Sequence, residues 1–209
     1  ADRVRQLASR TYHNKLGTDL ERVERLRKLA TKIQLSLPRG EKGKAYADRA
    51  ALLAKADLVT LMVGEFPELQ GVMGKYYAEA DGEEPSIVRA IEQHYWPRFS
   101  GDALPTGDTS IAVALADRLD ALVGMFSIGQ VPTGDKDPFG LRRAALGIVR
   151  ILMETTPPLN AELSPLIATA AGILKVPEEQ KSALVGSVRA FVRERLANPA
   201  PRRMTPPPG

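Results

Sequence analysis

Five basic side chains stand out in this sequence because their spacing would allow them to bind phosphate groups. Lys136, Arg142, Arg143 and Arg150 follow one another at intervals that place them along one edge of a helix, and Arg98 belongs to a loop rich in aromatic residues. Arg142 and Arg143 fall near the start of that helix, where the helix dipole disfavours cations. Helix stability therefore does not explain them, whereas contact with the phosphates of a nucleic acid would.

The same basic edge has a second explanation. Charged residues on an amphipathic helix commonly form its solvated face, and ion pairs with Asp135 and Asp137 would balance the positive charges. The sequence alone leaves both interpretations open, a phosphate-binding edge and a solvated face.

Other patterns that suggest chemistry are incomplete. Residues 129–136 contain two glycines separated by four residues and then a lysine, but Asp135 interrupts the P-loop pattern and no strand precedes it. Ser127 lacks the Gly-x-Ser-x-Gly frame of a serine hydrolase. The chain has no cysteine, which excludes disulfides, thiolate zinc sites and cysteine nucleophiles. It has two histidines, His13 and His94.

Length and composition are those of an ordinary globular protein. The 209 residues allow one large domain or two small ones, and 29 basic against 25 acidic residues give a net charge of +4. That charge permits a polyanionic partner without requiring one. No apolar run approaches the roughly 18 residues of a membrane span, and no signal peptide is visible, so we expect a cytoplasmic protein that makes no membrane contact. The start at Ala1 favours a piece excised from a longer chain.

The elements that must position these residues are helices. Apolar residues recur with helical period and no segment alternates as a strand does, which predicts an all-α fold. We expect helices at about residues 18–35, 44–65, 108–126, 137–154, 161–175 and 178–196. Prolines concentrate in residues 198–209, which predicts a linker or a disordered end.

Helix starts and apolar stripes give the expected packing. Thr18 is a predicted N-cap, residues 108–110 offer several caps, and Asp137 followed by Pro138 predicts a cap with proline at the first helical position. Asp117 and Asp120 lie three apart, away from the apolar stripe of their helix. The stripes predict a core that includes Leu52, Val59, Leu115, Leu119, Leu122, Leu141, Ile148 and Leu152.

Several longer motifs carry a resemblance to a known family. In order, they resemble segments of the β subunit of bacterial glycyl-tRNA synthetase, and the resemblance covers about residues 1–197. The motifs are HNKLG (13–17), LAKADL (53–58), EFPELQGVMG (65–74), YWPRFSGD (95–102), ADRLDAL (116–122), GQVPTGDKDPF (129–139) and LRRAA (141–145).

The resemblance implies a helical-bundle domain of the HD-superfamily type inside a much longer β subunit. In that family a separate α subunit carries the aminoacylation site, where ATP and Mg²⁺ are used to activate glycine before its transfer to tRNA-Gly. The β subunit contributes tRNA binding and a later anticodon-binding domain. Because neither that domain nor the earlier β domains are present, we expect a fragment or a truncated reading frame, with the α subunit, tRNA-Gly and the other β domains as partners.

The resemblance also raises an enzymatic alternative, because HD phosphohydrolases bind a divalent metal through a histidine, an adjacent His-Asp pair and a later aspartate. His13 could be the first ligand and Asp120, or Asp117, the last, but the pair reads Ala56-Asp57 and alanine cannot ligate a metal. We therefore expect no metal site, no cofactor and no catalytic residue in this chain. In place of a site, His13, Asp57 and Asp120 would form a degenerate cluster, buried and hydrogen-bonded, that joins three helices.

The leading hypothesis from the sequence is a non-catalytic domain that supports tRNA binding and subunit architecture for the charging of tRNA with glycine. Two alternatives stay open, a metal-dependent HD-type phosphohydrolase and a helical scaffold that contacts only protein.

Overall fold

A computed structural model describes residues 2–156, 159 and 161–197 of the chain, and the regular secondary structure within them is almost wholly helical. This confirms the predicted all-α class. The segment predicted to be a linker or disordered end, residues 198–209, lies outside the described residues. The α-helices are α1 (Asp2–Gln6), α2 (Asp19–Gln34), α3 (Lys44–Leu53), α4 (Leu61–Glu65), α5 (Val72–Ala80), α6 (Pro85–Gln93), α7 (Asp108–Ser127), α8 (Leu141–Glu154), α9 (Leu163–Ile173) and α10 (Glu178–Ala197).

Short elements join these helices. One antiparallel hairpin pairs Thr11 with Thr18, and it is too short to show strand alternation in the sequence. Its strands are β1 (Thr11–His13) and β2 (Gly17–Thr18), and the 3-10 turns are η1 (Leu7–Ser9), η2 (Gly40–Gly43), η3 (Ala56–Val59) and η4 (Pro67–Leu69).

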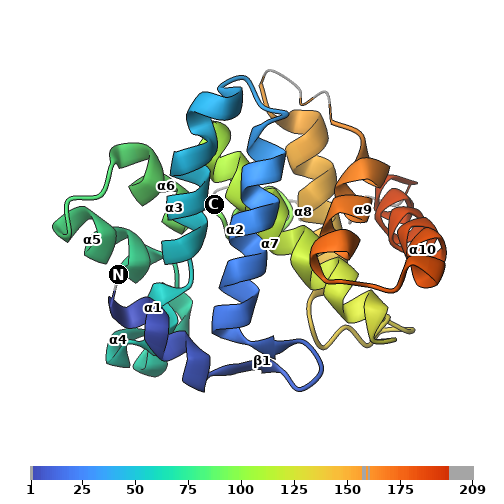
Figure 1. Ribbon diagram of the computed structural model, residues 1–209, viewed down its shortest axis with the longest axis horizontal. Coiled ribbons are helices and arrows are strands. Elements are labelled where there is room, and N and C mark those ends of the chain that lie inside the picture. Colours follow the sequence, from blue (N-terminus) through green and yellow to red (C-terminus); the bar gives the residue numbers. More distant parts are fainter. Residues whose placement is uncertain (1, 157–158, 160, 198–209) are drawn as a thin grey trace, which may run out of the picture.

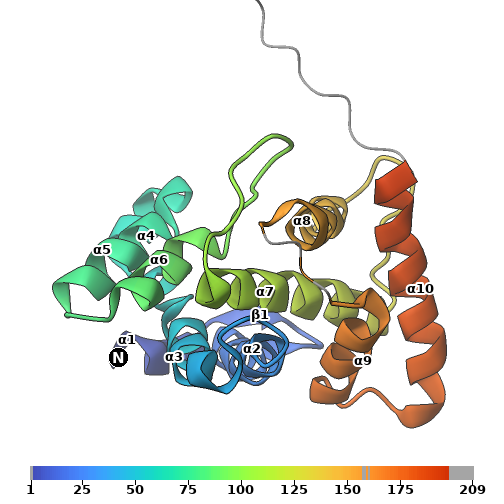
Figure 2. The same cartoon turned by 90° about the horizontal axis from the view of Figure 1, so that it is seen from above.

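Helix α7 lies at the centre of the fold. Its residues are small or apolar almost all round, and nearly all of them are buried. Such a helix must be covered on every side. Helices α2 and α3 pack on one side of it and α8 on the other, with α6 towards one end and α9 and α10 towards the other (Figures 1 and 2).

Helix α2 begins as its sequence predicts. The Thr18 hydroxyl accepts a hydrogen bond from the Glu21 backbone N–H at 3.2 Å, and the Glu21 carboxylate accepts one from the Thr18 N–H at 2.6 Å. This capping box fixes the start of α2 immediately after the hairpin. The helix then presents Arg22 and Arg25 towards α7.

The helix predicted at residues 44–65 is wrong beyond Leu53. The chain leaves the α-helix there, forms η3 and starts α4 anew at Leu61. Two local contacts favour the break: the Thr60 hydroxyl caps α4 by accepting from the Val63 N–H, and the Asp57 carboxylate accepts from the N–H groups of Gly71 and Gly74. The Asp57 contacts join η3 to the start of α5, and a continuous helix through residues 54–60 would not place Asp57 to make them.

The start of α8 also differs from the prediction. The helix begins at Leu141 after Gly140, whose φ of 64° suits glycine, so Pro138 is not its first residue. Asp137 nevertheless satisfies the helix start, because its carboxylate accepts from the Leu141 and Arg142 N–H groups at 2.8 and 2.9 Å. For α7 the residue at the cap position is Gly107 rather than one of residues 108–110.

The predicted core is largely confirmed. Leu115, Leu119, Leu122, Leu141 and Ile148 are fully buried, whereas Leu52, Val59 and Leu152 are half-buried and pack against the core from its edge. In the part of the chain described, no helix has the length and apolar character needed to cross a membrane.

A glycine on α8 sets how closely α7 and α8 approach. A Cβ atom at Gly147 would collide with the guanidinium group of Arg118, a buried side chain of α7. We expect Gly147→Ala to lower the free energy of unfolding by about 1 to 3 kcal/mol despite the better helix propensity of alanine, because Arg118 must leave its buried acceptors. Urea denaturation followed by circular dichroism measures the change.

Gly186 is the matched control. It lies inside α10, and a Cβ there would meet no atom within 4 Å. Gly186→Ala should raise the free energy of unfolding by about 0.5 to 1 kcal/mol, the usual gain at an unobstructed helical site. Equal stabilisation by both substitutions would show that Arg118 is not held against α8.

Candidate functional site

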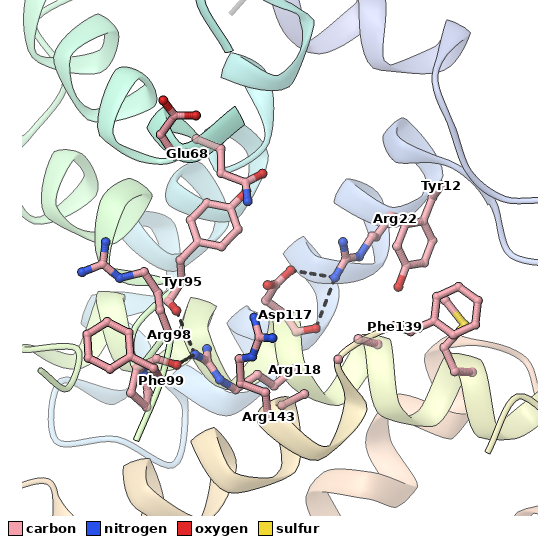
Figure 3. Close-up of a pocket in the computed structure, with 16 residues that line it drawn as sticks. Tyr12, Arg22, Glu68, Tyr95, Arg98, Phe99, Asp117, Arg118, Phe139 and Arg143 are labelled. Carbon is pink, nitrogen blue, oxygen red and sulfur yellow. Dashed lines mark hydrogen bonds and ion pairs between the residues drawn. The ribbon is translucent and has the colours of Figure 1, made fainter. Parts of the chain in front are cut away.

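A cleft of about 680 Å³ opens along one side of α7. Its walls come from α2, the turn η4, the loop after α6 and the start of α8, segments that are far apart in the sequence (Figure 3). The volume is in the range of small-molecule and single-nucleotide sites. Arginines and aromatic residues make up half of the residues that line it.

The floor of the cleft is a buried group of charges that joins α2 to α7. Arg22 donates to Asp117 at 2.9 Å and to Asp120 at 3.3 Å, and Arg25 donates to Asp120 at 2.7 Å. The Arg22 guanidinium also lies 4.2 Å from the centre of the Tyr12 ring. These arginines are already neutralised by their carboxylates, so they shape the cleft rather than supply free positive charge.

Lys55 enters the same group from the segment that follows α3. Its ammonium lies 3.0 Å from Asp117 Oδ1 and 3.0 Å from His94 Nε2, and 4.1 Å from the centre of the Tyr95 ring. His94 Nδ1 is 2.6 Å from the carbonyl oxygen of Ile91, which assigns the ring proton to Nδ1 and leaves Nε2 to accept from the ammonium. A lysine that is 2% exposed thus has a carboxylate, an imidazole and an aromatic face around it.

Burial and mutual charge shift the pKa values of this group. Burial lowers the pKa of Lys55 to about 8, although Asp117 opposes the shift. Burial and the neighbouring ammonium lower the pKa of His94 to about 3, so its imidazole is neutral. Burial alone would raise the pKa of Asp117, but Lys55 and Arg22 outweigh it and hold that pKa well below its usual range.

Arg118 fastens the aromatic loop to α7. Its guanidinium donates to the carbonyl oxygens of Tyr95 and Pro97 at 3.1 and 3.0 Å (Figure 3). It also donates to that of His94 at 2.9 Å and to that of Ala114 in its own helix. Burial lowers the pKa of Arg118 to about 10. Four backbone acceptors occupy both terminal nitrogens of the guanidinium, so Arg118 positions the loop that carries Arg98 and Phe99.

The rim of the cleft carries the accessible groups. Phe99 is 60% exposed and Phe139 42% exposed, unusually open positions for phenylalanine. Arg98 pairs with Asp102 at 3.0 Å but keeps about half of its side chain exposed. The side chain of Arg143 is exposed, and its guanidinium makes no hydrogen bond or ion pair with the residues that the structure describes. Guanidinium groups and open aromatic rings in one cleft suit phosphates and nucleobases.

The four residues predicted along one exposed edge, Lys136, Arg142, Arg143 and Arg150, take different positions, and the loop residue Arg98 joins one of them in the cleft. Arg98 and Arg143 both line the cleft, and Lys136 is exposed on the loop before α8. Arg142 donates to the carbonyl oxygens of Gly134 and Lys136, and so holds that loop. Arg150 is only 15% exposed and donates to the Asp102 carbonyl oxygen at 2.9 Å and to Glu154 at 3.1 Å, so its predicted exposure is wrong.

The predicted cluster of His13, Asp57 and Asp120 does not form. His13 lies on β1, where its Nδ1 accepts from the Lys15 N–H at 3.1 Å and its ring meets the edge of Phe139. Asp57 accepts from the start of α5, and Asp120 pairs with α2. A hydrolase-type divalent metal does not fit this arrangement, and no group of three His, Cys, Asp or Glu residues in the described ranges is placed to hold one.

Comparison with known proteins places the chain in a family. A sequence model described as "Glycyl-tRNA synthetase beta subunit" matches residues 1–204. The chain belongs to the glycyl-tRNA synthetase β-subunit family. It is 57% identical over 201 residues to a "Glycine--tRNA ligase beta subunit" of Aromatoleum aromaticum, and 59% identical over 195 residues to one of Paracidovorax citrulli. These alignments cover 94% and 93% of the chain but 27% of each relative, so the chain spans about a quarter of their length.

The motifs that carry the family resemblance converge on the cleft. Glu68 and Gln70 come from one motif, Tyr95 to Phe99 from the next, Asp117 and Arg118 from a third, and Phe139 and Arg143 from the last two. Segments separated by dozens of residues thus contribute most of one lining. In a member of the glycyl-tRNA synthetase β-subunit family, this convergence marks the cleft as the candidate functional site.

Sequence reasoning missed the buried half of this site. Lys55 lies inside a motif of the resemblance, but nothing local distinguishes it from a surface lysine, and no motif of the sequence includes His94. Lys55 contacts both Asp117 and His94, and each of these two lies more than thirty residues away from it in the sequence. The motif at residues 53–58 was the only signal that pointed to Lys55.

The neutral state of His94 predicts a pH dependence. In the unfolded chain histidine protonates below about pH 6.5, whereas folded His94 stays neutral down to about pH 3, so the unfolded state binds the extra proton as the pH falls. This contribution to stability is complete above pH 6.5 and is lost on acidification. We expect the loss of this contribution to lower the free energy of unfolding by about 2 kcal/mol when the pH falls from 7 to 5.

Urea denaturation at both pH values tests this with two variants. His94→Gln should reduce the difference between pH 7 and pH 5 by about 2 kcal/mol, whatever its effect on stability at pH 7. His13→Gln is the control and should keep the wild-type difference, because His94 is still present. An unchanged pH dependence in His94→Gln would show that His94 is not held neutral.

Proposed function

We propose that this chain is a non-catalytic helical domain of a bacterial glycine–tRNA ligase β subunit that binds tRNA through the cleft beside α7. The observation that carries the proposal is the rim of the cleft, where Arg98 lies 6.0 Å from the centre of the open Phe99 ring and Arg143 and Phe139 line the same cavity. Family membership supplies the substrate class, and the cleft supplies groups that suit it. Phosphate contacts from the two arginines would give affinity without base identity.

The three other predicted RNA contacts, Lys136, Arg142 and Arg150, differ in whether their side chains are free to bind phosphate. Lys136 is exposed and can add a phosphate contact from the loop beside the cleft. Arg142 and Arg150 stay predictions as RNA contacts, but their guanidinium groups already hold loop carbonyl oxygens. We therefore rank Arg98 and Arg143 first.

The α subunit would catalyse the charging of tRNA with glycine. We propose that the intact enzyme pairs this β chain with an α subunit, in the cytoplasm, and that ATP and Mg²⁺ act at the α subunit. The described residues of this chain would supply no catalytic group to that reaction. Their part would be to hold tRNA-Gly while the α subunit transfers glycine.

A contribution to subunit architecture has its own support. Met153 on α8 is 62% exposed and Leu196 on α10 is 46% exposed, and both line a groove between these helices and the segment before α9. Exposed apolar groups of this kind suit contact with further protein. Other domains of a β subunit would be the partners.

The two alternatives receive less support. Ala56 in the His-Asp pair and the separate positions of His13, Asp57 and Asp120 give no support to a metal-dependent phosphohydrolase. A scaffold that contacts only protein would not require an unpaired Arg143 in the same cleft as two exposed aromatic rings. It remains the alternative that the next experiment excludes or establishes.

Salt dependence of tRNA binding tests the proposal. We expect the 209-residue chain to bind tRNA with an affinity that falls steeply with salt concentration, because phosphate contacts release counterions. Arg143→Ala should weaken binding and reduce the slope of log K against log salt concentration by about 0.7 to 0.9, the share of one phosphate contact. Fluorescence anisotropy with labelled tRNA across a salt series measures both.

Arg189→Ala is the charge-matched control. Arg189 is exposed on α10, away from the cleft, and its replacement should leave the slope unchanged. In the complex with the α subunit, Arg143→Ala should impair tRNA charging and spare the tRNA-independent activation of glycine. Identical slopes for wild type, Arg143→Ala and Arg189→Ala would contradict tRNA binding at the cleft and favour the scaffold.

A further inference from the structure

The floor of the cleft offers one polar atom that the buried charge network leaves free. Arg22 and Lys55 both contact Oδ1 of Asp117, at 2.9 and 3.0 Å. The second oxygen, Oδ2, makes no hydrogen bond to any described residue, and the side chain keeps 14% exposure. Figure 3 places Asp117 in the middle of the cleft, between Arg22 and the arginines of the opposite wall.

The charge state of Asp117 decides what this oxygen can do. Two cationic neighbours keep the carboxylate ionised, so Oδ2 acts only as a hydrogen-bond acceptor. The network also holds the carboxylate in one orientation, because Oδ1 is bound from two sides. A ligand group that meets Oδ2 must therefore be a donor.

The surroundings of Oδ2 indicate which donor fits. Phe99 and Phe139 present exposed rings at the rim, Arg98 and Arg143 present cations there, and the carboxylate lies below them. A nucleotide has this order of groups: a phosphate for the cations, a flat base for the rings, and a polar base edge for the floor. A carboxylate oxygen accepts from the exocyclic amino group of cytosine or adenine, whereas uracil has the acceptor O4 at the position of the cytosine amino group and would have to shift to offer its N3–H instead.

We propose that the cleft binds one unpaired nucleotide of the RNA and that Asp117 Oδ2 selects bases that carry an exocyclic amino group over uracil. The proposal rests on the proposed function and adds base selection to it. The nucleotide must be unpaired, because a base within a duplex could not place its pairing edge on the floor of a cleft.

Short single-stranded RNA tests the selection directly. Labelled hexamers of cytidine and of uridine are a matched pair, because the two bases have the same size and differ at the group that would meet Oδ2. We expect the wild-type 209-residue chain to bind the cytidine hexamer at least about fivefold more tightly than the uridine hexamer at one salt concentration. A second pair is a hexamer of adenosine and a hexamer of purine riboside, a base that lacks the amino group. The adenosine hexamer should bind more tightly.

Variants separate selection from general affinity. Phe99→Ala and Arg143→Ala should weaken binding of both pyrimidine hexamers by similar factors and keep their ratio, because stacking and phosphate contact ignore the base edge. Asp117→Asn, once circular dichroism shows it folded, should lose the preference for cytidine, because its amide presents a donor where the carboxylate had only acceptors. Met153→Ala, on the far groove, is the control and should change neither affinity.

The outcomes distinguish this inference from the proposed function. Equal affinity of the wild-type chain for the cytidine and uridine hexamers overturns base selection, even if Asp117→Asn fails to fold. If tRNA binding still depends on Arg143 in that case, the proposed function stands alone. If neither hexamer binds and Arg143→Ala instead weakens association with the α subunit, the cleft is a protein contact and the inference is wrong.

Discussion

The carboxylate of Asp117 is the contact on which the arrangement of this domain depends. It lies on the central helix α7 and binds Arg22 from α2 and Lys55 from the segment after α3. Breaking one member of such a buried group leaves an unpaired charge, which commonly costs about 3 to 5 kcal/mol. Lys55 in turn donates to Nε2 of His94 at the end of α6, whose Nδ1 proton is held by the Ile91 carbonyl oxygen. Three helices are thereby oriented around one side chain, and the same side chain forms the floor of the cleft.

The arginines show how the surroundings of a residue, rather than its type, decide its role. Arg22 and Arg25 neutralise carboxylates, Arg118 binds backbone carbonyl oxygens, and Arg150 joins a loop to α8. Only an arginine without such partners, as Arg143 is among the described residues, can bind an external phosphate without giving up an internal contact. The net charge of +4 therefore says little about where an anion would bind.

Local signals in the sequence were sufficient for much of the fold. The cap at Thr18 and the apolar stripes of α7 and α8 predict those elements, because both signals depend on residues within a few turns of each other. The prediction of one helix over residues 44–65 is wrong because the Asp57 carboxylate accepts a hydrogen bond at the start of α5. Apolar periodicity does not reveal such a contact. The same limit applies to the site. Arg98 and Arg143 could be named from their surroundings in the sequence, but the pairing of Arg22 with Asp117 spans 95 residues and left no local pattern.

The most direct test of this account is a double-mutant cycle between Lys55 and Asp117, measured as the free energy of unfolding in urea at pH 7. Lys55→Met leaves Asp117 without one of its two cations, and Asp117→Asn leaves Lys55 without its carboxylate, while Arg22 keeps Asp120 in both variants. We predict that each single change costs about 3 kcal/mol or more and that the double variant is more stable than the sum of the two losses by at least about 1 kcal/mol. Small and additive losses would contradict the central place given to this buried pair.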